Sequence, residues 1–332
     1  MESEGLDPPL TATSERRAIL DRFGVYGDFP TRAMNWGVRR CPLYLEPIFI
    51  AVYTFLFWLA CARPRHAIAA NLAVVFPRSS RLANQFRALR VFWNFANSCV
   101  DAATVEDEGD VIDWEIVGTE NFQALAESPR DRGAVILSAH MGNYDVAAPV
   151  FAKRFRRRVH AVRAPERLAH TQAMRERNHP SPGASEDDLR IAYNTGHNFL
   201  GIDLIEALVA GDAVALQGDR ILFGVSPLPA TLCGAPVRFP KGPFTLALAA
   251  KVPIYPLFII RTGRRRYQVR VEQPFACERL HSDGRDKNPA LNRAASEWAG
   301  VLEPLVRRHW HQWFVFEPVF TDVSASTSTS RP

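Results

Sequence analysis

Apolar and polar positions follow two different periods along the chain. Between 66 and 104 apolar residues recur at helical spacing, and Phe76-Pro77 separates two helices because proline ends a helix and Ser79 and Ser80 can cap the next one. Beyond the acidic stretch around 106–110, short apolar runs alternate with helical stretches. This alternation predicts an α/β fold whose mixed, mostly parallel sheet is flanked by helices. We expect strands at 134–138, 159–162, 213–217, 254–260 and 267–271, and helices at 119–127, 143–152, 201–210 and 242–250.

An apolar, aromatic stretch runs from 42 to 62 with Glu46 as its only charge. A membrane span needs roughly 20 apolar residues, so this stretch has borderline length. A crossing, a helix lying in the membrane interface and a buried core helix are all compatible with it. Basic residues on both sides would hold such a helix at the level of the lipid headgroups. They are Arg39, Arg40, Arg63 and Arg65.

Four regions follow from these patterns. We expect a polar, disordered lead over 1–40, a membrane-associated helical segment over 41–104, an α/β catalytic domain over 105–320 and a disordered tail over 321–332. The first 17 residues carry acids, Pro and Ser before any apolar run, which is not the order of a cleaved secretory signal. Within the α/β domain, 164–200 is polar and rich in His, Arg, Pro and Gly, and predicts a flexible excursion that can cover a site.

Composition and charge narrow the class of protein. With 332 residues, 47% of them hydrophobic, the chain can bury a sizeable core. Forty Lys and Arg against 35 Asp and Glu give a net charge of +5, which favours anionic partners such as lipid headgroups but does not indicate a nucleic-acid binder. Five scattered cysteines without a CxxC pair suit a reducing, cytoplasm-facing location and give no indication of a metal site.

The window 134–150 carries the candidate chemistry. An apolar strand ends just before His140, Gly142 makes a turn, Asn143 can cap a new helix, and Asp145 lies in its first turn. The turn can bring the imidazole back onto the carboxylate, which would fix one ring nitrogen as a donor and leave the other to take a proton. The alternative is that Asp145 complements the helix N-terminus and His140 is an ordinary loop residue.

The residues from His140 to Asp145 resemble the His-x4-Asp (HX4D) motif of the lysophospholipid acyltransferase superfamily, and specifically its lipid A biosynthesis (lauroyl/myristoyl) acyltransferase branch. Further segments resemble blocks of that branch in the same order, so that the similarity covers roughly 40–317. These are Asn71-Leu72 with Val75-Phe76-Pro77, Val162-Arg163, the block from Leu216 to Arg220, the block from Val237 to Phe244, and the block from Val252 to Pro256.

The resemblance implies an acyltransferase that moves a fatty acyl group from a thioester on acyl carrier protein or coenzyme A to a hydroxyl or amine of a lipid-like acceptor. It implies no cofactor besides the thioester, and a place at the cytoplasmic face of a bacterial inner membrane, peripheral or single-pass. His140 would be the general base and Asp145 its partner. The implied substrate-binding residues are Gly142, Asn143, Arg163, Asp219, Arg220, Lys241 and Gly242, with Arg163 or Lys241 as candidate oxyanion stabilisers.

Other classes of enzyme lack their motifs here. The sequence has no G-x-S-x-G elbow, no HExxH metal site, no P-loop and no GxGxxG turn. Where glycerolipid relatives carry an acid, Thr or Ser and then Arg, this chain has Lys241-Gly242-Pro243, so their phosphate-reading arginine is not carried over. The acceptor therefore stays open among a sugar-lipid, an amino-acid lipid, a glycerolipid and another hydroxylated product. A catalytically inactive lipid-binding or membrane-scaffold protein of the same fold is the alternative function.

Overall fold

The computed structural model describes 33–34, 36–37, 39–42, 44–109, 111–127, 132–155, 157–164, 189–195, 199–221, 225–280 and 288–320. The chain forms two compact units, Met1–Ala62 and Arg63–Pro332, and the division falls inside the predicted helical segment 41–104. Most of the predicted lead and the whole predicted tail lie outside the described residues, and the described residues from 33 to 40 are helical.

The first unit contains α3 (Glu46–Ala60), within the predicted apolar stretch. Proline near its N-terminus suits a helix start, where the missing N–H leaves no hydrogen bond unmade. Five apolar side chains at helical spacing along α3 are exposed: Ile48, Val52, Phe55, Leu56 and Leu59. Among the described residues no single helix is long and apolar enough to cross a membrane. Taken together, as one interrupted span, α3 and α4 have the length and the apolar composition that a crossing needs. Membrane association stays a prediction.

The break between the two predicted helices is confirmed. The first, α4 (Ala62–Val75), ends just before Phe76-Pro77, and α5 (Arg81–Glu108) follows. Ser80 caps α5, because its Oγ atom accepts a hydrogen bond from the backbone N–H of Ala83 at 3.1 Å. The helix runs on to Glu108 and ends at Gly109, which has φ of +83°, so the acidic residues at 106–108 belong to its last turn.

The second unit is built on an eight-stranded sheet with the order β1-β9-β8-β2-β5-β3-β4, to which β10 adds beside β8. The strands β8, β2, β5, β3 and β4 are parallel, whereas β9 and β10 run antiparallel to β8, and β1 runs parallel to β9. The predicted mixed, mostly parallel sheet is therefore confirmed. The strands are β1 (Asp113–Val117), β2 (Ala134–Ser138), β3 (Val159–Arg163), β4 (Leu189–Tyr193), β5 (Ala213–Gln217), β8 (Pro253–Gly263), β9 (Arg266–Val271) and β10 (Phe275–Ala276).

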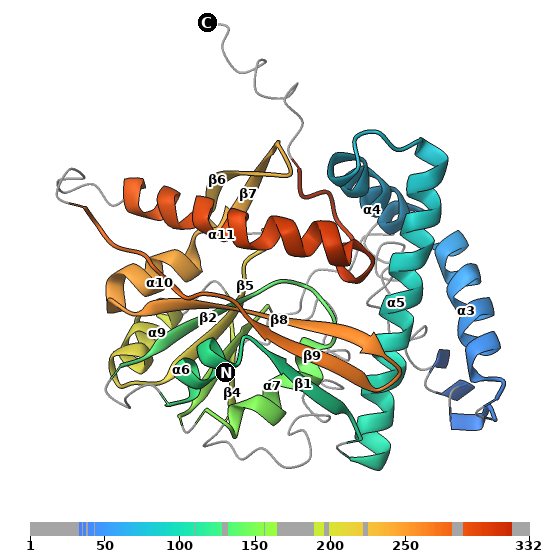
Figure 1. Cartoon of the computed structure of the whole chain (residues 1–332), viewed down its shortest axis with the longest axis horizontal. Helices are drawn as coiled ribbons and strands as arrows, with labels where there is room; N and C mark the ends of the chain where they lie inside the picture. Colours follow the sequence, from blue (N-terminus) through green and yellow to red (C-terminus); the bar gives the residue numbers. More distant parts are fainter. Residues whose placement is uncertain are drawn as a thin grey trace, which may run out of the picture. The chain divides into compact units, whose positions relative to one another are not determined.

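Helices cover both faces of this sheet, and alternate strand residues feed two separate cores. Val135 and Leu137 of β2 face the core shared with α9 (Leu200–Val209), α10 (Gly242–Ala250) and α11 (Asn288–His309). Ala134 and Ile136 face the core shared with α6 (Thr119–Glu127) and α7 (Tyr144–Ala152). Figure 1 shows α11 above the sheet and α6 and α7 below it. Both faces are buried, which is why the central strands read as continuous apolar runs.

Several elements had no counterpart among the predictions. The hairpin of β6 (Pro227–Leu232) and β7 (Ala235–Pro240) turns at Cys233 and Gly234, whose φ values of +55° and +81° suit a two-residue hairpin loop. The prolines in this hairpin obscure its strand pattern. The prediction of a flexible excursion over 164–200 is wrong at its far end, where β4 extends the sheet; 165–188 lies outside the described residues.

Candidate active site

His140 lies two residues beyond the end of β2, at the carboxyl edge of the parallel strands. The predicted order of strand, histidine, turn and helix is confirmed, with α7 beginning at Tyr144. Gly142 makes the turn with φ of +58°, and a Cβ atom there would lie 2.1 Å from the carbonyl oxygen of Ile259 on β8. Both the backbone conformation and the space therefore require glycine.

The imidazole of His140 is held by Asp219. His140 Nδ1 lies 2.6 Å from Asp219 Oδ1, and the backbone N–H of His140 donates to Asp219 Oδ2 at 2.9 Å. Both residues are buried, with exposed fractions of 7% and 0%. A carboxylate on Nδ1 makes this nitrogen the proton donor and leaves Nε2 as the acceptor, which is the tautomer that a general base requires.

Asp219 is stabilised as a carboxylate although it is fully buried. Burial acts to raise its pKa, but the attraction and hydrogen bonds of His140, together with the indole N–H of Trp313, outweigh burial and lower it. Trp313 Nε1 donates to Asp219 Oδ2 at 2.9 Å. The pair is thus arranged to stabilise an imidazolium that forms on His140.

Arg220 occupies the other side of the ring. Its Nε atom donates to His140 Nε2 at 3.2 Å, and its guanidinium lies 3.5 Å from the carboxylate of Glu317. The ring nitrogen that would take a proton is therefore covered by a cationic donor.

The segment that follows α11, residues 313–320, packs against the histidine. The backbone N–H of Phe314 donates to the carbonyl oxygen of His140 at 2.7 Å, and Met141 forms an isolated β-bridge with Trp313. Asn71 of α4 holds the same segment, because its amide donates to the Glu317 carbonyl at 2.8 Å and accepts from the Val319 N–H at 3.0 Å. The Asn71-Leu72 block noted in the sequence thus holds the segment that lies against the histidine.

The model of the bacterial lipid A biosynthesis acyltransferase family matches residues 25–321. The chain belongs to this family. It is an acyltransferase, and the acyl group passes to a lipid. The comparison with curated proteins gave no match.

The expected pairing of His140 with Asp145 needs correction. The carboxylate on His140 Nδ1 belongs to Asp219, whereas Asp145 Oδ1 lies 2.7 Å from the Nη2 atom of Arg163. The reason is the sheet: β2 and β5 are parallel neighbours with Ser138 opposite Gln217, so the residues two positions further on, His140 and Asp219, leave the same edge together. A role for Asp145 in catalysis stays a prediction.

The structure gathers four of the nine predicted site residues directly around the histidine or its turn: Asp219, Arg220, Gly142 and Asn143. Asn143 is buried, and its amide donates to the Ser98 carbonyl on α5 at 2.9 Å, so that it ties the start of α7 to α5. Lys241 and Gly242 lie at the start of α10, where the Lys241 N–H donates to the Ser226 carbonyl. Substrate binding by these two stays a prediction.

An apolar cavity of about 110 Å³ lies between α7 and the sheet. Its polar lining residues, Ser138, Arg163 and Gln217, are the last residues of β2, β3 and β5. The cavity also reaches Tyr144, whose ring lies edge-on to the His140 imidazole with centroids 6.0 Å apart. The cavity therefore extends from the edge that carries the histidine. The remaining lining is apolar: Ile136, Ala147, Ala148, Phe155, Val159, Ala161, Val162, Ala215, Leu216, Leu257 and Ile259.

No group of three or more His, Cys, Asp or Glu side chains suited to a metal ion occurs in the part of the chain that the structure describes. The expectation that the acyltransferase uses neither metal nor cofactor stays a prediction.

Proposed function

We propose that the acyltransferase moves a fatty acyl group from a thioester, on acyl carrier protein or coenzyme A, to a hydroxyl or amine of a lipid-like acceptor, with His140 as general base. The single observation that carries this proposal is the buried His140–Asp219 pair at the edge of an apolar cavity. Asp219 takes the orienting role that the sequence suggested for Asp145.

In this mechanism the acceptor displaces the guanidinium of Arg220 from His140 Nε2 and gives its proton to that nitrogen. The acceptor oxygen or nitrogen attacks the thioester carbonyl carbon, the carbon–sulfur bond breaks, and the leaving thiolate takes the proton from the imidazolium. Positioned proton transfer of this kind is worth on the order of 10²- to 10⁴-fold in rate. Asp219 stabilises the imidazolium throughout, without taking a proton itself.

The oxyanion formed on attack needs hydrogen-bond donors. Arg163 lines the cavity, and its guanidinium is held in place by Asp145, which suits a preorganised donor. Arg220, once moved from His140, is the second candidate. This arrangement gives Asp145 a positioning role through Arg163.

The apolar cavity suits the start of an acyl chain. An engineered cavity of about 150 Å³ holds benzene, so about 110 Å³ has room for roughly four carbon atoms. The chain would enter beside the histidine and point along the strands toward Phe155 and Val159. The remainder of a long chain would extend beyond the cavity.

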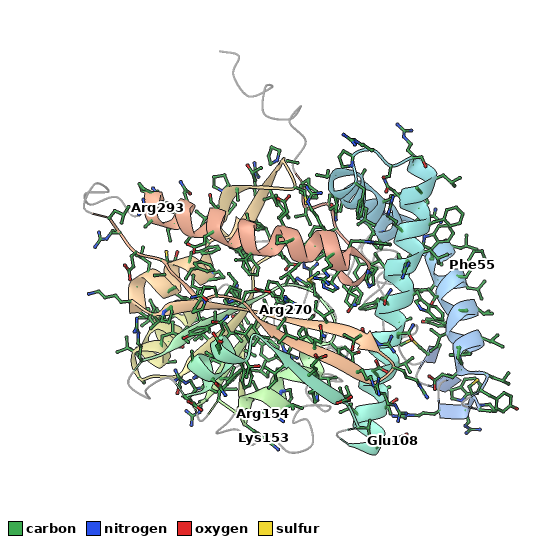
Figure 2. The ribbon with its side chains drawn as sticks, in the orientation of Figure 1. Phe55, Glu108, Lys153, Arg154, Arg270 and Arg293 are labelled. Atoms are coloured by element: carbon green, nitrogen blue, oxygen red, sulfur yellow. The ribbon has the colours of Figure 1, made fainter. Side chains whose placement is uncertain are left out.

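We further propose that the acyltransferase works at the cytoplasmic face of a bacterial inner membrane, as a peripheral or single-pass protein. The exposed apolar stripe of α3 supports this, and Figure 2 shows the Phe55 side chain projecting from that helix. A helix that exposes such an apolar stripe can bind in the membrane interface, where a lipid acceptor is found.

The test is transfer of a labelled acyl group, from either carrier, to a bacterial lipid extract. We expect the wild type to label lipid and His140→Ala to lose at least about a hundredfold in rate. His160→Ala is the matched control, because His160 is also buried and pairs with a carboxylate, Asp212, at 2.7 Å, yet belongs to the opposite end of the strands. Full transfer by His140→Ala would overturn the mechanism, and no transfer by the wild type would favour the inactive lipid-binding protein.

A further inference from the structure

Gln217 carries a polar group that the fold leaves unpaired. Within the described part of the chain its Nε2 atom is buried and has no hydrogen-bond partner. The residue ends β5 and lines the apolar cavity between α7 and the sheet. A buried amide donor without a partner is unfavourable, and native proteins retain few of them.

Ser138 lies directly opposite Gln217 across the β2–β5 pair and lines the same cavity. Its hydroxyl lies 3.4 Å from the Ala139 carbonyl, which is longer than the usual 2.5–3.0 Å of an O–H···O hydrogen bond. The hydroxyl thus retains capacity for a stronger partner. Together with Arg163 at the end of β3, these two side chains form the polar end of a cavity whose remaining lining is apolar or aromatic.

The sheet sets the position of this polar end relative to the chemistry. Ser138 and Gln217 each lie two residues before a member of the buried pair, His140 and Asp219. Two residues along a parallel strand correspond to about 6.6 Å. A chain whose thioester carbonyl lies at the histidine therefore passes Ser138 and Gln217 with its first few carbons.

We propose that the cavity selects acyl chains that carry a hydroxyl group near the thioester, read by Gln217 and Ser138, over plain alkyl chains. This inference rests on the proposed acyl transfer. A plain alkyl chain that fills the cavity excludes water from the Gln217 amide without forming a hydrogen bond to it. A hydroxyl group on the chain can both donate and accept such a bond. Sites built to bond a substrate hydroxyl reject the analogue that lacks it much more strongly than apolar pockets distinguish one methylene.

The test is a competition between thioesters of equal chain length: dodecanoyl, 2-hydroxydodecanoyl and 3-hydroxydodecanoyl groups, each on coenzyme A and on acyl carrier protein. A bacterial lipid extract serves as acceptor, and product ratios give the ratio of kcat/KM directly. We expect one hydroxylated chain to be preferred at least about tenfold by the wild type. Equal use of all three chains, or preference for the plain chain, would overturn the inference while leaving the acyl transfer in place. No transfer of any chain would overturn both.

Gln217→Leu separates recognition of the hydroxyl from a general effect. Leucine has a similar volume and no polar atoms, and replacing an unpaired amide does not remove a hydrogen bond within the protein, so the variant is expected to fold with an unchanged or raised Tm. We expect it to use the plain chain better and the hydroxylated chain worse. Loss of activity by one common factor for all chains would instead mean that the amide serves the thioester carbonyl, and would contradict the inference.

Leu257→Met is the matched control for the shape of the cavity. Leu257 lines the same cavity, and methionine conserves its volume and apolar character. We expect this variant to change the use of all three chains by one factor, leaving their ratio as in the wild type. A change in that ratio as large as that of Gln217→Leu would show that shape, rather than the amide, sets the preference.

Discussion

The indole N–H of Trp313 donates to Asp219 Oδ2 at 2.9 Å, and the same oxygen accepts the backbone N–H of His140. The carboxylate that orients the histidine is thus itself held by a side chain 94 residues further along. Because Asp219 is fully buried, each of these donors contributes to keeping its charge in place.

Replacing Trp313 by phenylalanine should therefore lower both stability and activity. A hydrogen bond to a charged group contributes about 1.5–3 kcal/mol, so we expect a loss of about 2 kcal/mol in the free energy of unfolding, measured by denaturant titration. Trp298→Phe is the matched control, because its buried indole donates to a neutral acceptor, the Gly218 carbonyl, at 2.9 Å. A larger loss of acyl transfer in Trp298→Phe than in Trp313→Phe would contradict this reasoning.

Replacing Asp219 should lower kcat much more than replacing Asp145. Asp219→Asn keeps the shape but no longer stabilises the protonated ring in the required tautomer, so we expect kcat to fall by about 10³- to 10⁴-fold. Asp145→Asn loosens Arg163 and should lower kcat by no more than about tenfold, because the Asp145 pair is partly exposed. Steady-state kinetics with one acyl donor compares them, and the opposite order would return the orienting role to Asp145.

Gly142→Ala should be strongly destabilising. Positive φ costs an alanine about 1–2 kcal/mol, and its Cβ would also clash with the backbone of β8 at 2.1 Å. The matched control is Gly300→Ala in α11, where a Cβ meets nothing within 4 Å and helix propensity favours alanine by about 0.5–1 kcal/mol. Thermal unfolding should show opposite shifts in Tm, and a similar decrease in both variants would refute the argument.

The sequence was sufficient to predict the bounds of several helices and strands, but not to identify the carboxylate that pairs with His140. The spacing of apolar residues and the positions of prolines predicted the exact bounds of β2, β5, α6 and α10. Both faces of the central strands are buried, and the helices end at clear breaks in the pattern. The orienting carboxylate was assigned to the nearest acid, Asp145. Asp219 is 79 residues from His140, and only the order of the strands brings the two together.

A signal for Asp219 was nevertheless present. Like His140, it lies two residues beyond a short apolar strand, and such positions meet when two parallel strands are neighbours. The sequence does not state which strands are neighbours, since β2 and β5 are separated along the chain by β3 and β4. The Gln217 amide and the contacts of Trp313 depend on the same long-range order and could not be predicted.

Acidification should destabilise the fold between about pH 6.5 and about pH 4 through His311. Burial, followed by Arg90 and His309, lowers the pKa of His311 from 6.5 to about 4. In that window the unfolded chain binds a proton that the folded chain does not, so stability falls as the pH falls. Burial, followed by Arg308 and Arg270, also lowers the pKa of His309, which acts in the same direction.

The variant His311→Gln should show a flatter dependence of Tm on pH across this window than the wild type. Asp219 does not confuse the comparison, because its lowered pKa means that its contribution is lost mainly below its ordinary value of 3.8 and to the same extent in both proteins. Curves for wild type and His311→Gln that run parallel from neutral pH to about pH 4 would show that His311 is not responsible.

The contacts of Phe314 with His140 and of Trp313 with Asp219 can form only after residues 313 and 314 have been synthesised. A ribosome makes the histidine first, the aspartate next and this segment after both. Chains released before Trp313 is added contain the whole sheet. They lack the indole N–H that binds Asp219 and the backbone N–H of Phe314 that binds the His140 carbonyl. Premature termination near the end of α11 would therefore yield a protein that has its base but not the support for it.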